Sequence, residues 1–523
     1  MKDSPELFEL IRSLSPNEKR YISMSISSQG ENPAYYKLFR AFETLKKHDT
    51  EALYESVKKE SFVHRLPAIK HYLHQLILKN LRNFHSGTTI EVNMHEAFIE
   101  VDILHQKGLL QQASKLLQKI QKEAEQKEKF ELLNICYSWE RELYLESLYS
   151  KGKSELSNFY KKKHINNTKI ENLNNYNHLL DQLFQFNSKK GTVRSKADEH
   201  WIKRFLQDPL IRDKNKALSN SALNIYYNIR AFCFYILLDY RESLQNITAT
   251  LNLMERDLPI NKPSLEYYID ICTNKVLLHI YLREYSKARA TLEEIEQLPV
   301  RAKKEKWKYT IHGVGLFQIE RAKNHFGMLI QIMSGKYQAA MQYIEKMEKL
   351  MQNSMHKIGD RSLLLFNYYS AYTYFILGNY KLTLSYLRKI LNYQKADTLL
   401  REDIYCYSKL LYLITHYEIQ SGDLPSYLLK STYRFLLQRN RIYGTEDAIL
   451  SFIRNRLLKN TNPQLVTKNF VELRNKLEKI SQNPHEKRIY EYFDFIAWLD
   501  SKITHRPFLE IMKAKHKDKS ELN

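Results

Sequence analysis

A tyrosine that follows a short turn recurs along the middle of this 523-residue chain. Each time, an apolar stretch ends, two or three turn-forming or polar residues follow, and the tyrosine comes next, as in YFILGNY. The tyrosines are Tyr240, Tyr285, Tyr337 and Tyr380, with gaps of 45, 52 and 43 residues. A regular period of this length is typical of repeat proteins, in which stacked units bury a continuous core. We therefore expect a solenoid.

The pattern extends in both directions. Leu110 in QKGLLQQA lies three periods before Tyr240, and Leu424 in SGDLPSY lies one period after the last tyrosine. The intermediate steps, placed by arithmetic, fall near Ser154 and Ala197, each just after a glycine. These positions together predict about eight units.

Each unit is predicted to be two helices. Between the turns, apolar residues recur at spacings of three and four, as in Leu223, Tyr226 and Tyr227. Only 13 glycines and 12 prolines are present, and sheet-rich folds need both for hairpins and bulges. Alternating stretches typical of strands are hard to find. The predicted fold class is all-α.

A small residue follows three positions after each turn anchor and would let the second helix cross closely over the first. These residues are Ala113, Ser243, Ala288, Ala340 and Thr383. Together with the turn, the aromatic anchor and the later apolar positions, this pattern resembles the tetratricopeptide repeat family. The resemblance implies a right-handed α-solenoid of two-helix repeats. It departs from the family in its period of roughly 44 residues, where the family has about 34, and in lacking most of the Trp-Leu-Gly signature.

The repeat divides the chain into three predicted parts. Residues 1–87 lack it and would form an N-terminal helical bundle that caps the solenoid, because end repeats need a polar outer face. Residues 88–504 would form the solenoid, and residues 505–523 a basic, disordered tail. Within the first part, SPNEKRYISMS could instead be the recognition piece of a helix-turn-helix.

The net charge and the absence of targeting signals limit which partners and which location are expected. The formal charge is +22, which raises affinity for acidic proteins, nucleic acid or anionic membranes. The amino terminus lacks the basic start and apolar run of a signal peptide, and apolar runs reach only about 8 residues where a span needs roughly 20. We expect a cytoplasmic protein without membrane insertion.

Signatures of catalysis and of ligand chemistry are missing from the sequence. No phosphate loop, GxSxG elbow or HExxH pair occurs, and four cysteines without a CxxC pair favour buried free thiols. We therefore expect a protein that is not an enzyme and that has no catalytic residues, no cofactor and no metal.

The inner surface of the solenoid is the first candidate site. In the family that the chain resembles, the first helix of each unit lines the concave face and holds peptides. Counting back twelve, eight and five residues from each anchor predicts a groove rich in tyrosine and phenylalanine. Alternatively, these side chains are core between helices. The candidates are Asn228, Phe232, Tyr235, Thr273, Leu277, His325, Tyr368, Tyr372, Phe375, Tyr412 and His416.

The gap of 52 residues marks the second candidate site. About eight residues have been added near PVRAKKEKWKYT, and insertions in repeats often carry binding. Basic residues contact phosphates, and aromatic residues stack on bases or pack against partner side chains. The alternative is a solvated helix extension whose tryptophan docks on its neighbour. The patch consists of Arg301, Lys303, Lys304, Lys306, Trp307 and Lys308.

These features favour a non-catalytic scaffold or regulator that binds a protein or peptide in its groove, and the basic patches would select acidic partners. A second hypothesis is nucleic-acid binding by the basic regions 151–216 and 301–361, whose net charges are +8 and +7. A third is a regulator with an N-terminal DNA-binding head and repeats that sense a peptide.

Overall fold

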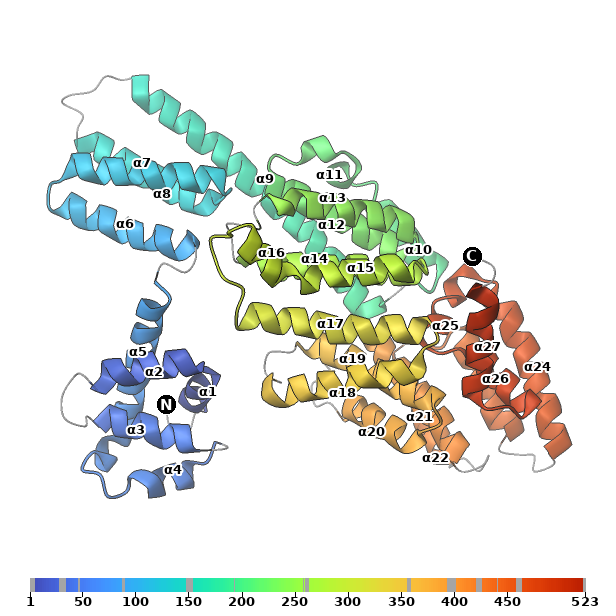
Figure 1. The fold of residues 1–523 in the computed structure, drawn as a ribbon. Coiled ribbons are helices and arrows are strands. Elements are labelled where there is room, and N and C mark those ends of the chain that lie inside the picture. Colours follow the sequence, from blue (N-terminus) through green and yellow to red (C-terminus); the bar gives the residue numbers. More distant parts are fainter. Residues whose placement is uncertain are drawn as a thin grey trace. The chain divides into compact units, whose positions relative to one another are not determined.

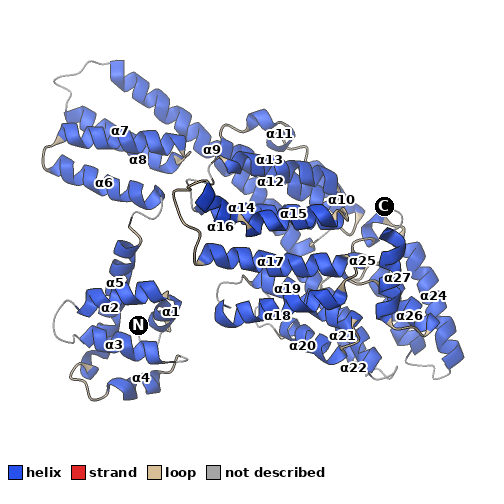
Figure 2. Cartoon of the chain, viewed as in Figure 1, coloured by secondary structure: helices blue, strands red, loops and turns tan. Residues whose placement is uncertain are grey.

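A computed structural model describes most of the chain, namely residues 5–27, 34–45, 48–86, 90–146, 154–191, 193–256, 258, 263–354, 359–392, 401–419, 426–439, 441–457 and 463–520. Within these residues the regular elements are helices, and none is a β-strand (Figure 1, Figure 2). The all-α prediction is confirmed. The chain forms two compact units, one of residues 1–123 and 138–151, and the other of residues 124–137 and 152–523.

The first unit begins with a five-helix bundle that has its own apolar core around Ile11, Phe39 and Leu73. Its second helix starts with a capping box, in which the backbone N–H of Glu18 donates to Ser15 Oγ and that of Ser15 donates to the Glu18 carboxylate. The helices are α1 (Glu6–Ser13), α2 (Pro16–Ser27), α3 (Ala34–Thr44), α4 (Thr50–Val57) and α5 (Leu66–Phe84). That this bundle caps the solenoid stays a prediction.

The next helices match the predicted helix starts but not a regular two-helix period. They are α6 (Ile90–Gln106), α7 (Leu110–Gln126), α8 (Phe130–Glu146), α9 (Ser154–Lys190), α10 (Lys196–Phe205) and α11 (Pro209–Arg212). Leu110 and Ser154 each begin a helix, and Ala197 is the second residue of α10. However, α9 is one helix of 37 residues, so the two-helix unit breaks down there and eight regular units are not reached.

Regular pairs follow from residue 220 onward, and consecutive helices pack side by side (Figure 1). They are α12 (Asn220–Ile236) with α13 (Tyr240–Glu255), α14 (Pro263–Tyr281) with α15 (Tyr285–Glu296), α17 (Val314–Met333) with α18 (Tyr337–Ser354), α19 (Asp360–Ile376) with α20 (Tyr380–Leu391), and α21 (Glu402–Ile419) with α22 (Ser426–Gln438). Each of the four anchor tyrosines is the first residue of a second helix, as predicted. Leu424 lies outside the described residues.

The turns share one backbone device. The residue two places before each anchor has a left-handed φ: 66° at Leu238, 62° at Arg283, 77° at Gly335 and 76° at Gly378. This conformation ends the first helix and reverses the chain. The predicted small residues after the anchors are all buried, and Ser243 Oγ donates to the Ala231 carbonyl of the facing helix at 2.8 Å.

The C-terminal part completes the second unit with α23 (Gly444–Phe452), α24 (Pro463–Ser481), α25 (Ile489–Tyr492), α26 (Phe495–Thr504) and α27 (Phe508–Ser520). The predicted disordered tail is wrong for residues 508–520, which form α27. Phe508 and Met512 of α27 are buried in the main core, and Lys515 forms an ion pair with Asp494. These two apolar side chains hold a lysine-rich helix in place.

Candidate functional site

The predicted groove residues lie on the first helices of the pairs, but part of this face is already covered. Tyr368, Tyr372 and Phe375 of α19 are all buried, and their partners are aromatic residues of the C-terminal part. The Tyr368 ring lies 6.0 Å from that of Tyr492, and the Tyr372 and Phe375 rings lie 5.8 and 5.3 Å from that of Phe493. These three candidates are therefore core, and the chain itself fills their pocket.

Tyr235 of α12 belongs to the same covered region. The guanidinium of Arg488 lies 4.5 Å from the centroid of the Tyr235 ring and 5.4 Å from that of Tyr281. Its charge is matched by Glu491 at 3.2 Å, and Glu491 also accepts a hydrogen bond from the hydroxyl of Tyr240. Burial raises the pKa of Glu491, although Arg488 opposes this shift. An aromatic cage thus holds a cation from the chain's own C-terminal part.

A polar cluster remains accessible on α12 and α14. The hydroxyl of Tyr267, a residue 42% exposed, donates to Asn224 Oδ1 at 3.0 Å and accepts a hydrogen bond from Asn228. Partial burial raises the pKa of Tyr267 to about 12, so its hydroxyl stays protonated. Of these three residues the sequence predicted only Asn228, because Asn224 and Tyr267 lie four and six residues before the first predicted position of their helices, Asn228 and Thr273.

The accessible face continues on α17 with Arg321, which donates to Asp270 Oδ1 at 3.1 Å and to Ser362 Oγ at 2.9 Å. One turn later, burial and then the charge of Arg321 lower the pKa of His325 to about 4, so its imidazole is neutral. Arg321 and His325 therefore place a cation and a neutral imidazole one turn apart on this helix. Asp270 is itself exposed.

The remaining groove candidates are divided between core and surface. Thr273 is buried and donates to the carbonyl of Asp270 in its own helix. Phe232 and Leu277 are half-buried. Tyr412 and His416 contact each other with ring centroids 4.6 Å apart, and burial lowers the pKa of His416. The structure therefore does not join all eleven candidates into one accessible row.

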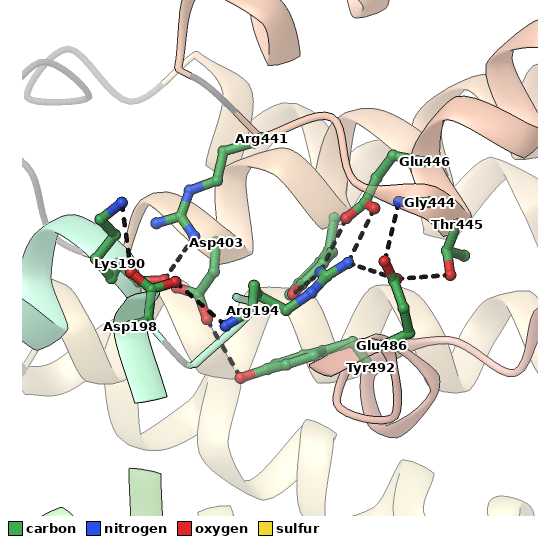
Figure 3. A network of polar contacts seen from close by, with 11 residues as sticks. Lys190, Arg194, Asp198, Asp403, Arg441, Gly444, Thr445, Glu446, Glu486 and Tyr492 are labelled. Atoms are coloured by element: carbon green, nitrogen blue, oxygen red, sulfur yellow. Dashed lines mark hydrogen bonds and ion pairs between the residues drawn. The ribbon is translucent and has the colours of Figure 1, made fainter. Parts of the chain in front are cut away.

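A buried ionic network that the sequence did not predict lies where α9 ends (Figure 3). Arg194 donates to both oxygens of Glu446 at 3.0 Å and to Glu486 at 2.8 Å. Glu486 also accepts from the backbone N–H of Gly444 and the hydroxyl of Thr445, each at 2.9 Å. Burial outweighs Arg194 and raises the pKa of Glu446. The network ties segments about 250 residues apart in sequence.

A second set of charges completes this network. Arg401 donates to both oxygens of Asp403 and to the Tyr492 hydroxyl. Burial alone would raise the pKa of Asp403, but Arg401 lowers it. Arg441 donates to the last carbonyls of α9, at Lys189 and Lys190, and so satisfies groups that a helix end leaves unpaired. The arrangement joins the end of α9 to the segments around Asp403 and Arg441.

The predicted basic patch is divided by its packing. Trp307 is buried in the main core and its indole N–H donates to Glu305 at 2.9 Å. Arg301 pairs with Glu255 at 2.6 Å and with Glu305 at 3.0 Å. Lys303, Lys304, Lys306 and Lys308 are exposed and have no ion pair within the described part of the chain. The four lysines therefore lie on the surface, whereas Trp307 fixes this segment to the main core.

The cysteines and the possible metal ligands form no reactive site among the described residues. Burial raises the pKa of Cys233, Cys272 and Cys406 to about 12, which makes these thiols poor nucleophiles. Among the described residues, no three metal-binding side chains gather into a site. Nor does any helix in those residues have the length and apolarity to cross a bilayer. No protein-family model matches the chain, and no curated protein is significantly similar to it in sequence.

Proposed function

We propose that this protein is a non-catalytic scaffold or regulator with a tetratricopeptide-like, right-handed helical-repeat body that binds a segment of another protein. The observation that supports this most is the way the first-helix face holds the chain's own C-terminal part. Arg488 in the cage of Tyr235 and Tyr281, and Phe493 against Tyr372, show the kind of side chain that such a face accepts.

The ligand would occupy the accessible part of this face on α12, α14 and α17. Asn224, Asn228 and Tyr267 offer amide and hydroxyl groups suited to a peptide backbone, and Arg321 with Asp270 offers charges of both signs. A partner is expected to retain binding at moderate salt, because such contacts depend less on counterion release than phosphate contacts do.

Affinity capture from the native cell lysate tests this proposal, with and without nuclease and at moderate salt. Proteins that are retained by the wild type and lost with Asn228→Ala combined with Tyr267→Ala would support it. The control is Tyr427→Ala on α22, which removes a tyrosine that is 67% exposed from another helix. Retention that is unchanged by the double variant would contradict the proposed face.

A second candidate function is nucleic-acid binding, favoured by one observation on α9. Tyr160 is exposed, and Lys161 and Lys162 beside it are exposed too. An aromatic ring free to stack next to cations fits single-stranded nucleic acid. Fluorescence titration with a single-stranded oligonucleotide at several salt concentrations tests it. This function would be supported if the affinity falls steeply as salt is raised and if Tyr160→Ala lowers the affinity at a given salt concentration. No binding at low salt would reject it.

A further inference from the structure

The residues added between α15 and α17 form a distinct surface, here named the insert and defined as residues 298–316. It contains the short helix α16 (Leu298–Lys304) and the chain that leads into α17. One side of it is fixed to the repeat core: Leu298, Trp307 and Ile311 are buried there. The insert is therefore a formed part of the fold.

Polar contacts fix the same side to the end of α13 and to Leu258, which follows it. Arg301 donates to the carboxylate of Glu255 near the end of α13, and its guanidinium lies 5.7 Å from the centroid of the Trp307 ring. The hydroxyl of Tyr309 donates to the Leu258 carbonyl at 2.8 Å. These contacts orient the opposite side of the insert toward solvent.

The outward side has an apolar, basic, apolar order along the chain. Val300 is 61% exposed at one end, and Val314 and Leu316 are 45% and 42% exposed at the other. Between them lie the exposed lysines Lys303, Lys304, Lys306 and Lys308. The one acidic residue of the insert, Glu305, pairs with Arg301 and also interacts with Lys304, so a single carboxylate faces four exposed lysines and positive charge remains in excess.

We propose that the insert is a docking surface for a linear protein segment with an acidic centre and apolar residues on both sides. The lysines of the insert would attract the acidic centre of the bound segment. The exposed aliphatic side chains of the insert, which are poorly solvated, would pack against the apolar residues on both sides of that centre. The inference rests on the proposed function in taking a protein as the ligand, but it places that ligand on a surface other than the first-helix face.

Two alternative occupants fit the insert less well. Single-stranded nucleic acid binds to rings that stack on its bases. Trp307 is buried and Tyr309 is half-buried, with its hydroxyl bonded to the Leu258 carbonyl, so the insert fully exposes neither of these rings. A second copy of this chain would bring its own formal charge of +22 to a surface of lysines, which repel it.

Fluorescence anisotropy with two synthetic peptides of identical composition tests the proposal on the full chain. One peptide has a glutamate centre flanked by leucines, and the other has a leucine centre flanked by glutamates. We expect the first to bind about tenfold more tightly, a ratio that net charge cannot produce because both peptides carry the same net charge. Equal affinities, or no binding of the first peptide, would overturn the proposal.

Variants locate the binding. Lys303→Glu, Lys304→Glu and Lys306→Glu together should weaken the first peptide about tenfold or more, and Val300→Ser with Leu316→Ser should remove its advantage over the second. The control, Lys468→Glu, Lys476→Glu and Lys479→Glu on α24, makes the same change in net charge at other exposed lysines. An equal loss with the control would overturn the proposal.

A third probe separates the partner classes. If a thymidine oligonucleotide binds the same lysines more tightly than the first peptide, the insert is a nucleic-acid surface and the proposal is wrong. If lysate proteins depend on Tyr267 while neither peptide binds, the proposed function stands and this inference alone fails.

Discussion

Arg488 lies over the ring of Tyr235, 4.5 Å from its centroid, although about 250 residues separate the two in sequence. Arg488 is almost completely buried, and its charge is matched by Glu491. The contact joins the first regular repeat to the C-terminal part. It shows that the face formed by the first helices of the pairs is partly covered by the chain itself.

Replacing Arg488 with alanine should destabilise the second unit by about 3 kcal/mol, because it removes the fully buried guanidinium from the aromatic cage and leaves the half-buried Glu491 without its cation. Urea unfolding followed by circular dichroism measures the effect. Arg474→Ala is the matched control, since Arg474 pairs with Asp500 and Glu478 at a partly exposed position and should cost less than about 1 kcal/mol. Equal losses for the two variants would contradict the importance of the cage.

Removing a glycine from one turn and introducing a glycine into another should change the stability in opposite directions. Gly378 has a φ of 76° and no atom near a built Cβ, so Gly378→Ala tests backbone strain alone and should cost about 1 kcal/mol. Arg283 is exposed and has a φ of 62°, so Arg283→Gly should be neutral or stabilise by up to about 1 kcal/mol. Thermal unfolding measures both. A stabilising Gly378→Ala would show that the turn is not under this constraint.

Stability should fall between pH 7 and pH 4 because of His325. Burial, followed by the charge of Arg321, lowers its pKa from 6.5 to about 4. Below pH 6.5 the unfolded chain binds a proton at this histidine that the folded chain does not, so acid favours unfolding. His325→Gln should flatten this decline by about 2 kcal/mol, measured by urea unfolding at both pH values.

The exposed His200 supplies the control for that experiment. His200→Gln should leave the decline as in the wild type, because an exposed imidazole has solvent around it in both states. A decline that is identical in wild type and His325→Gln would show that this histidine is protonated in the folded protein.

The last helix should contribute to stability despite its lysines. Phe508 lies 5.6 Å from Phe375, measured between ring centroids, and is buried. Phe508→Ala should therefore cost about 3 kcal/mol, in the range for a large aromatic side chain in a core. Lys513→Ala, at an exposed position of the same helix, should change little. Thermal unfolding compares them, and equal effects would mean that α27 does not pack as described.

Local features of the sequence predicted local structure well. The turn before Tyr240 or Tyr380 is specified by a few neighbouring residues, so the start of the following helix could be read from the pattern. The same holds for the buried Ala340 on α18, because the helix that it packs near, α17, ends only a few residues before it. Such signals do not depend on the rest of the chain.

Long-range contacts could not be predicted in this way. The spacing placed Tyr368 and Tyr372 on one helix face, but nothing near them indicates that Tyr492 and Phe493 cover that face. Likewise, no local pattern relates Arg194 to Glu446. The tail was misjudged because its many lysines outweighed Phe508 and Met512, two apolar residues whose spacing fits a packed helix.

The contacts of Arg441 with the end of α9, and of Arg194 with Glu446 and Glu486, also constrain how the protein is made. A ribosome releases the chain from its N-terminus, so the repeats emerge long before the residues that cover their inner face. Until then Tyr235, Tyr368 and Phe375 are left open to water and to other nascent chains. Folding of the second unit is completed only after residues 441–493 have been synthesised, so the repeats made earlier must wait for them without aggregating.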